Sequence, residues 1–196
     1  ITSINSATVA SELGAGGTTC NVSVTAADDQ CPYVINYTIY NTGTVDMAVT
    51  FSPTKAGLRR IGLDMRLSED FEDVVYYARG PWENYVDRQV GSYLGQYTTT
   101  ITDLFEEYTH PQSMGNRMDM RMLTLTNPTN GDQVRIESQG QVSFSLSHYD
   151  EAEFLKPIAH TWDITRHPEV YAHFDYMQRG LGNGSCGPGT LSQYYC

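Results

Sequence analysis

Apolar and polar residues alternate along several segments, and this period-two pattern restricts the possible folds more than any other feature. In residues 142–147, Val142, Phe144 and Leu146 are separated by serines, and residues 60–67 alternate in the same way. The pattern recurs in residues 35–39, 47–51, 134–136 and 170–176. Alternation of this kind predicts β-strands with one face on a core and the other toward water or a polar partner.

Turn signals separate these segments at spacings typical of antiparallel sandwiches. Asn41-Thr-Gly43 and the run from Asn127 to Gly131 are the clearest examples. Helix signals are weak: residues 103–106 and 150–153 each suggest one short turn. The sequence therefore predicts an all-β fold, a large antiparallel β-sandwich with few short helical turns.

The length of 196 residues allows one large domain or two small ones. We expect a single sandwich domain over residues 1–196, in which the small, polar residues 1–17 form a linker or an edge segment. Hydrophobic content of 40% and charged content of 18% are typical of a globular protein. No stretch is apolar and long enough to span a bilayer, and the chain starts as though cut from something longer.

The charge balance argues against polyanionic partners. With 23 acidic and 12 basic residues, the net charge of −11 repels nucleic acid and anionic membranes. We expect no nucleic-acid partner and no membrane partner. A neutral ligand such as a sugar suits this charge better than a phosphate.

The four cysteines form two pairs along the sequence. Cys20 and Cys31 flank a predicted hairpin, with strands over 21–25 and 33–40, and we expect a disulfide between them. That bond favours a periplasmic or secreted protein over a cytoplasmic one. Two reduced thiols in a cytoplasmic protein are the alternative. The pairing of Cys186 and Cys196 stays open.

One decapeptide, Arg79-Gly-Pro-Trp-Glu-Asn-Tyr-Val-Asp-Arg88, combines a turn signal, two aromatic rings and four charges. Taken alone, it predicts a rigid loop pinned by its own ion pairs. Residues 182–187 match the letters of a dinucleotide-binding loop, but Pro188 follows and no helix does. Because that loop must open a helix, a flexible surface loop is the better interpretation.

Neighbouring acidic residues do not form a catalytic pair in this interpretation. They occur in turns and polar stretches, where solvated surface is usual, at Asp28-Asp29, Glu69-Asp70, Glu72-Asp73 and Glu106-Glu107. We expect no two convergent carboxylates, no catalytic residue and no metal site. His148 continues an inward register and is expected to be packed, whereas His173 and Asp175 share one strand face and are suited to lining a polar groove.

Four segments in order closely resemble the C-terminal β-sandwich of family 2 β-galactosidases, over residues 58–189. They are Arg60–Leu63, Arg79–Arg88, Pro111–Arg117 and Tyr176–Pro188. The resemblance implies a galactose mutarotase-like supersandwich that is an accessory domain of a larger enzyme hydrolysing terminal β-D-galactosides. The catalytic glutamates of that family lie on a (β/α)₈ barrel of roughly 250 residues, which this chain is too short to hold. The isolated chain is therefore expected to be inactive.

The resemblance also implies roles for named residues. A loop at the active-site rim follows Gln178-Arg-Gly-Leu-Gly182, so Gly182, Asn183, Ser185 and Cys186 are implied to contact the β-galactoside. Loop rigidity and docking onto the remaining domains of the same enzyme are assigned to six residues: Arg79, Trp82, Glu83, Asn84, Asp87 and Arg88. No cofactor is implied for this chain, and Mg or Na ions are implied for the complete enzyme.

Two positions depart from the family pattern. Ser185-Cys186 stands where many members have Ser-Trp, and a cysteine cannot stack on a sugar as an indole does. Ser113-Met114 stands where Glu-Asn is common. Two alternatives remain: a stand-alone carbohydrate-binding module and a mutarotase-like enzyme, although no mutarotase motif is present.

Overall fold

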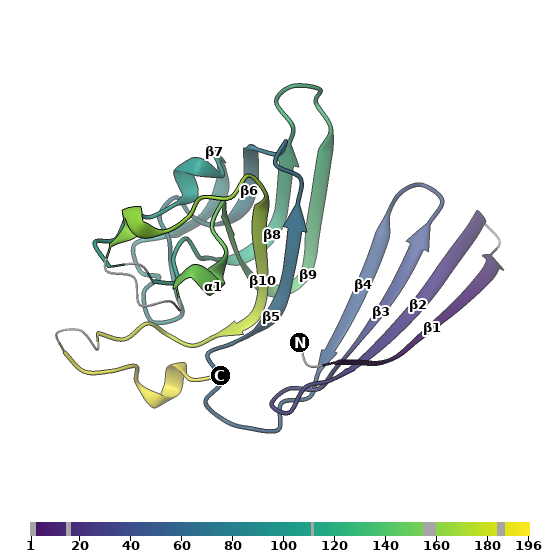
Figure 1. The fold of residues 1–196 in the computed structure, drawn as a ribbon, viewed down its shortest axis with the longest axis horizontal. Helices are drawn as coiled ribbons and strands as arrows, with labels where there is room; N and C mark the ends of the chain where they lie inside the picture. Colours follow the sequence, from purple (N-terminus) through teal and green to yellow (C-terminus); the bar gives the residue numbers. More distant parts are fainter. Residues whose placement is uncertain (1–2, 15–16, 111, 155–159, 184–186) are drawn as a thin grey trace. The chain divides into compact units, whose positions relative to one another are not determined.

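The computed structural model describes residues 3–14, 17–110, 112–154, 160–183 and 187–196. Strands dominate, in two antiparallel sheets, and the predicted all-β class is confirmed. The chain divides into two compact units, residues 1–57 and 58–196, each built around one of the sheets. The sequence analysis expected one domain over this length. Figure 1 shows the strands of both units.

The first unit is a four-stranded meander in which each strand pairs with the next along the chain. Its strands are β1 (Ser3–Gly14), β2 (Gly17–Ala27), β3 (Tyr33–Tyr40) and β4 (Val45–Phe51). The segment expected to be a linker or an edge segment thus contains the edge strand β1. Gly43 has a φ of 88° in the β3–β4 turn, a conformation that glycine adopts at little cost.

The strand register of this unit contradicts the expected disulfide between Cys20 and Cys31. In the β2–β3 ladder Cys20 lies opposite Ile39, whereas Ala26 lies opposite Tyr33 beside the turn that holds Cys31. Cys20 is therefore six residues, or about 20 Å of strand, away from the turn. Both thiols are free, so this pair gives no support to the argument for export.

The second unit is a six-stranded sheet of order β5-β10-β9-β8-β6-β7, in which β5 pairs with the distant strand β10 and β6 pairs with β8 as well as with β7. Its strands are β5 (Arg60–Leu67), β6 (Asp73–Gly80), β7 (Tyr93–Thr100), β8 (Arg117–Thr126), β9 (Gln133–Ser147) and β10 (Val170–Gln178). The helical elements are short, as predicted: η1 (Thr102–Leu104), α1 (Glu151–Phe154), η2 (Thr161–Asp163) and η3 (Ser192–Tyr194).

The core of this unit is formed by alternating residues of neighbouring strands together with Ile101 and Leu104 at η1. Tyr76, Phe144 and Leu123 are among its largest members, and each is almost completely buried. The Phe144 ring meets Tyr76 edge-on, with 5.3 Å between the ring centroids. This packing fixes the sheet from which the loops described below extend.

His148 is packed, as predicted. It is buried just after β9, and its Nε2 lies 2.9 Å from Oε2 of Glu72. Its Nδ1 lies 3.2 Å from the carbonyl oxygens of Pro168 and Glu169. The ring therefore joins the end of β9 to the β5–β6 connection and to the start of β10.

Candidate functional site

The 79–88 segment leaves β6 at the end of the sheet and turns through a cis peptide bond between Gly80 and Pro81. The Glu83 carboxylate is buried there and accepts hydrogen bonds from the Arg88 guanidinium and from the hydroxyls of Tyr85 and Tyr108. It also accepts a 2.8 Å bond from the backbone N–H of Gly115. The predicted internal ion pair is thus present, and it is one part of a larger network.

Asn84 is completely buried and connects this segment to the start of β8. Its Nδ2 donates to the carbonyl oxygens of Arg79 and Trp82, at 3.1 and 3.0 Å. Its Oδ1 accepts a 2.9 Å bond from the Met118 N–H, and its own carbonyl accepts a 2.7 Å bond from Asn116. Every polar group of the Asn84 side chain is therefore satisfied inside the chain, which is the requirement for burying an amide.

Two further residues of the 79–88 segment reach distant parts of the chain. Arg79 Nε lies 2.5 Å from Oδ2 of Asp119, in β8. Asp87 accepts hydrogen bonds from the N–H groups of Leu181 and Gly182, at 3.1 and 2.8 Å. The segment therefore fixes both the start of β8 and the beginning of the glycine-rich loop, residues 180–189.

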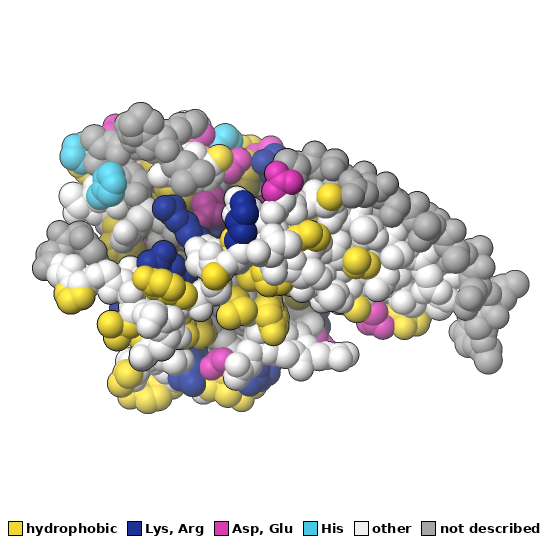
Figure 2. Space-filling model, turned by 90° about the horizontal axis from the view of Figure 1, so that it is seen from below, with side chains coloured by type: hydrophobic (Ala, Val, Ile, Leu, Met, Phe, Trp, Pro, Cys, Tyr) yellow, Lys and Arg dark blue, Asp and Glu magenta, His cyan; other side chains and the backbone are white. Residues whose placement is uncertain are grey.

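Trp82 belongs to the 79–88 segment but is not covered by it. Trp82 is 70% exposed, and Arg88 lies over the buried Tyr85 ring instead. Tyr93, also 70% exposed, pairs with Gly80 in the β6–β7 ladder, two residues before Trp82. Large apolar side chains therefore gather next to β7, an edge strand of its sheet. Figure 2 shows hydrophobic side chains at the surface of one face of the molecule.

The glycine-rich loop leaves β10 and lies outside helices and strands in its described residues, as predicted. Gly180 is buried against Asp87, and a Cβ there would lie only 2.6 Å from the Asp87 carboxyl carbon, so the close contact requires glycine. Gly182 has a φ of 66°, and Asn183 donates its N–H to the Pro188 carbonyl at 2.9 Å. The remaining two residues assigned to substrate contact, Ser185 and Cys186, lie outside the described residues.

The expectation that no carboxylates converge is wrong. Five residues form what we call the Arg60 cluster: Arg60, Asp64, Glu151, His173 and Asp175. Arg60 lies 2.8 Å from Glu151 and 3.1 Å from Asp175, and His173 lies 2.5 Å from Asp64. The β5–β10 register, which places His173 opposite Asp64 and Asp175 opposite Gly62, brings these residues together. The sequence analysis placed His173 and Asp175 on one face of their strand but did not identify Arg60, Asp64 and Glu151 as their neighbours.

Burial and mutual contacts set the protonation of this cluster. Asp175 is 1% exposed, and desolvation raises the pKa of its carboxyl to about 7 although Arg60 opposes that shift. Desolvation lowers the pKa of His173, but the hydrogen bond to Asp64 and the charges of Asp64 and Glu151 together outweigh it, and the net pKa is raised. The same bond lowers the pKa of Asp64. Each charge of the cluster thus has an internal partner.

Within the residues that the structure describes, no helix is both long and apolar enough to cross a membrane. The same residues contain no group of three or more His, Cys, Asp or Glu side chains placed to hold a metal ion.

The second unit is therefore an all-β unit. Polar side chains of the 79–88 segment fix the start of β8 and the glycine-rich loop at the end of its sheet. The family model described as "Beta galactosidase small chain" matches residues 2–196. The chain belongs to this family.

Several β-galactosidases are similar to parts of the chain. The β-galactosidase of Staphylococcus xylosus is 33% identical over 138 residues, 70% of this chain and 14% of the relative. That of Lactococcus lactis is 31% identical over 165 residues, 81% of this chain and 16% of the relative. A Kluyveromyces lactis β-galactosidase is 29% identical over 69% of this chain and 13% of the relative. The chain thus spans about one seventh of the length of these relatives.

Proposed function

We propose that this chain is an accessory domain of a larger β-galactosidase that hydrolyses terminal β-D-galactosides. In this proposal the domain packs on a catalytic barrel formed by other residues of the enzyme and contributes the glycine-rich loop to the active-site rim. The observation that carries the proposal is the family match over residues 2–196, combined with relatives whose matched part is about one seventh of their length.

The contacts of the 79–88 segment support the structural half of the proposal. Asp87 fixes the first residues of the glycine-rich loop, and Glu83 and Asn84 fix Asp87 by anchoring the segment that carries it. A loop that completes an active site must be held in place, because catalysis depends on positioning to within fractions of an ångström. Trp82 and Tyr93 supply exposed apolar surface of the kind that packing against another domain would cover.

The first experiment tests whether hydrolysis needs the rest of the enzyme. The 196-residue chain and the complete enzyme are assayed side by side on a chromogenic β-galactoside. We expect turnover only from the complete enzyme, because in this proposal the two catalytic carboxylates that retaining hydrolysis needs lie on the barrel. Turnover by the chain that persists through repurification and is lost in Asp175→Asn would overturn the proposal.

The second experiment tests the loop in the complete enzyme. Asp87→Ala releases the N–H groups of Leu181 and Gly182, so we expect kcat/KM for an aryl β-galactoside to fall about tenfold. The matched control is Asp29→Ala, an exposed acidic residue of the first unit, which should leave kcat/KM unchanged. Equal activity of Asp87→Ala and the control would show that the loop does not take part in the active site.

A mutarotase-like activity is the second candidate, and the Arg60 cluster is the observation that favours it. Histidine and carboxylate groups side by side are suited to general acid and base catalysis at a sugar ring, and His173 Nε2 lies 3.9 Å from Glu151. Polarimetry on α-galactose tests this activity. A rate above buffer that His173→Ala removes would favour this candidate, and a rate equal to buffer would exclude it.

A further inference from the structure

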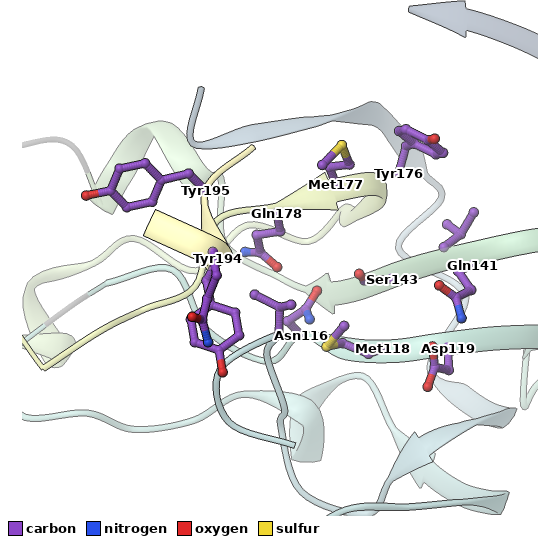
Figure 3. Close-up of a pocket in the computed structure, with 13 residues that line it drawn as sticks. Asn116, Met118, Asp119, Gln141, Ser143, Tyr176, Met177, Gln178, Tyr194 and Tyr195 are labelled. Carbon is purple, nitrogen blue, oxygen red and sulfur yellow. The ribbon is translucent and has the colours of Figure 1, made fainter. Parts of the chain in front are cut away.

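A pocket of about 220 Å³ opens over the middle of the six-stranded sheet of the second unit. Its base is the segment from Gln141 to Ser143 in β9, and its walls come from the neighbouring strands β8 and β10 and from the residues around η3. Figure 3 shows Asn116, Ser143 and Gln178 between Tyr194 on one side and Tyr176 on the other. The 79–88 segment contributes one lining residue, Val86.

Irregularities in both flanking strands shape this pocket. The register between β8 and β9 shifts between Arg117 and Met120. On the other side of β9, the register between β10 and β5 shifts between Asp175 and Met177. Bulges of this kind redirect side chains and are frequent beside functional sites. Asp119, within the first shift, has a φ of 57°, which is uncommon for any residue other than glycine. Such strained positions concentrate where function requires them.

The lining is polar, aromatic and nearly neutral. Asp119 is the one charged side chain among the described lining residues, and Arg79 neutralises it at 2.5 Å. Planar amides and a hydroxyl make up most of the remaining polar surface. An anionic ligand finds no cation in this lining, and a cationic ligand finds a carboxylate that is already paired.

Two acceptors at the pocket wall lack hydrogen-bond donors in the described part of the chain. Asn116 is 1% exposed, and its Nδ2 is used by the Asn84 carbonyl, while its Oδ1 accepts no hydrogen bond. Gln178 Oε1 is likewise buried without a donor. A buried acceptor without a donor costs free energy. Both oxygens are buried, so a ligand hydroxyl could donate to either one, and remove that cost, only after the amide turns toward the pocket.

We propose that this pocket binds one ring of a neutral saccharide. Hydroxyl groups match the amide and serine side chains, and the apolar face of a sugar ring matches Tyr176, which is 63% exposed at the pocket edge. The volume lies below the usual range of about 300–1,000 Å³ for drug-sized ligands, which suits a single ring. The pocket adjoins the glycine-rich loop, because Gln178 precedes that loop and Tyr194, whose carbonyl accepts the Gly180 N–H at 2.9 Å, follows it. The saccharide proposal does not require that the loop reaches an active site.

The test uses the complete enzyme labelled with ¹³C-methyl methionine, because Met118 and Met177 both line the pocket. Their signals are assigned with Met118→Leu and Met177→Leu. Titration with methyl β-galactoside, methyl β-glucoside and glucuronate then separates neutral from charged sugars. We expect saturable, millimolar shifts of both methyl signals with at least one neutral glycoside. No shift up to solubility, or shifts with glucuronate alone, would overturn the proposal.

Matched variants locate the binding. Tyr176→Ala should weaken binding about tenfold through the loss of ring contact, whereas Tyr93→Ala, an equally exposed tyrosine outside the pocket, should not change it. Gln141→Ala should also weaken binding, and Gln133→Ala, at the other end of β9, should not. All four positions are on the surface of the fold, so folded variants are expected. Identical affinity in Tyr176→Ala, Gln141→Ala and their controls would contradict the proposed site.

Discussion

Residues 1–57 and residues 58–196 both form antiparallel sheets, yet different contacts hold the two sheets together. In the first unit every strand pairs with its neighbour in the sequence, and only Ala26 and Ile35 are buried apolar residues among the side chains described there. In the second unit β5 pairs with β10, about a hundred residues away, and a buried core joins the strands. Local hairpins thus define one sheet, and long-range packing with a buried polar network defines the other.

This difference bears on where function is located. A polar network such as that of Glu83 and Asn84 holds its geometry because every buried group has a partner, and its partners come from segments far apart in the chain. A meander without such a network positions its side chains only through the ladder itself. The proposed loop and the proposed saccharide pocket both lie in the second unit, where the long-range contacts are.

The largest expected effect tests the core of the second unit. Phe144→Ala removes a fully buried ring, so the free energy of unfolding should fall by about 3–5 kcal/mol. Val45→Ala, at a half-exposed position in β4, should change it by about 0.5 kcal/mol or less. Urea unfolding followed by circular dichroism in the far ultraviolet measures both, because both units are built of β-strands. Similar losses in the two units would show that the first sheet is packed as tightly as the second.

The next expected effect is a dependence on pH. The pKa of Asp175 is about 7 in the folded chain and near 3.8 in the unfolded one, so the folded state binds the extra proton between these values. Stability should therefore fall as the pH rises from about 4 to about 7, by about 4 kcal/mol at most. In Asp175→Asn the fall should be smaller by this amount, and the raised pKa of His173 should account for part of what is left. Urea unfolding at pH 4.5 and at pH 8 measures the difference, and parallel curves for the two proteins would contradict it.

In the first unit, Asp28 should change stability with pH in the opposite direction. The backbone N–H groups of Gln30 and Cys31 lower the pKa of Asp28, so its contribution is present above the unfolded value and lost as the pH falls. Because this pKa is lowered from 3.8 and so titrates below pH 4, Asp28→Asn should leave the fall between pH 4 and pH 7 unchanged. The pH profile of the whole chain should therefore follow Asp175 and not Asp28.

A third prediction concerns the buried amide of the 79–88 segment. Asn84→Ala leaves the Met118 N–H and the carbonyls of Arg79 and Trp82 without their partner, which should cost about 2–3 kcal/mol. Asn36→Ala, at an exposed position in β3, is the matched control and should be nearly neutral. Thermal unfolding of both variants measures the difference. A neutral Asn84→Ala would mean that the network does not stabilise the second unit.

How far the sequence predicts this structure follows from the range of the contacts involved. Alternation was sufficient for β5, β9 and β10, and glycine-containing turns were placed at Gly43 and Gly131, because both signals depend on neighbouring residues. The strands β6, β7 and β8 were not predicted individually. The expected Cys20–Cys31 bond was wrong because Cys20 lies at the far end of its strand whereas Cys31 lies beside the turn, so the two cannot be opposite each other in the ladder.

In the candidate site, too, the sequence predicted what depends on neighbouring residues and missed what depends on distant ones. The unusual composition of residues 79–88 identified the segment, but its partners Asp119, Gly115 and Leu181 come from other parts of the chain, and only the fold brings them together. The Arg60 cluster was missed for the same reason, since Glu151 follows β9 whereas Arg60 opens β5. Asn116 and Gln178 carry no sequence signal for a pocket, because burial without a hydrogen-bond donor is a property of the fold.

The smallest expected change in the stability of the chain tests most directly whether the 79–88 segment docks onto another domain of the enzyme. Trp82→Ala removes an indole that is 70% exposed, so the unfolding free energy of the 196-residue chain should change by about 0.5 kcal/mol or less. In the complete enzyme the same substitution should lower the thermal midpoint clearly, because another domain would cover the indole there. Val90→Ala, at a position 95% exposed in the adjacent loop, is the control. If Trp82→Ala changes the chain and the complete enzyme by the same amount, Trp82 does not contribute to a domain interface, and the apolar surface beside β7 requires a different partner.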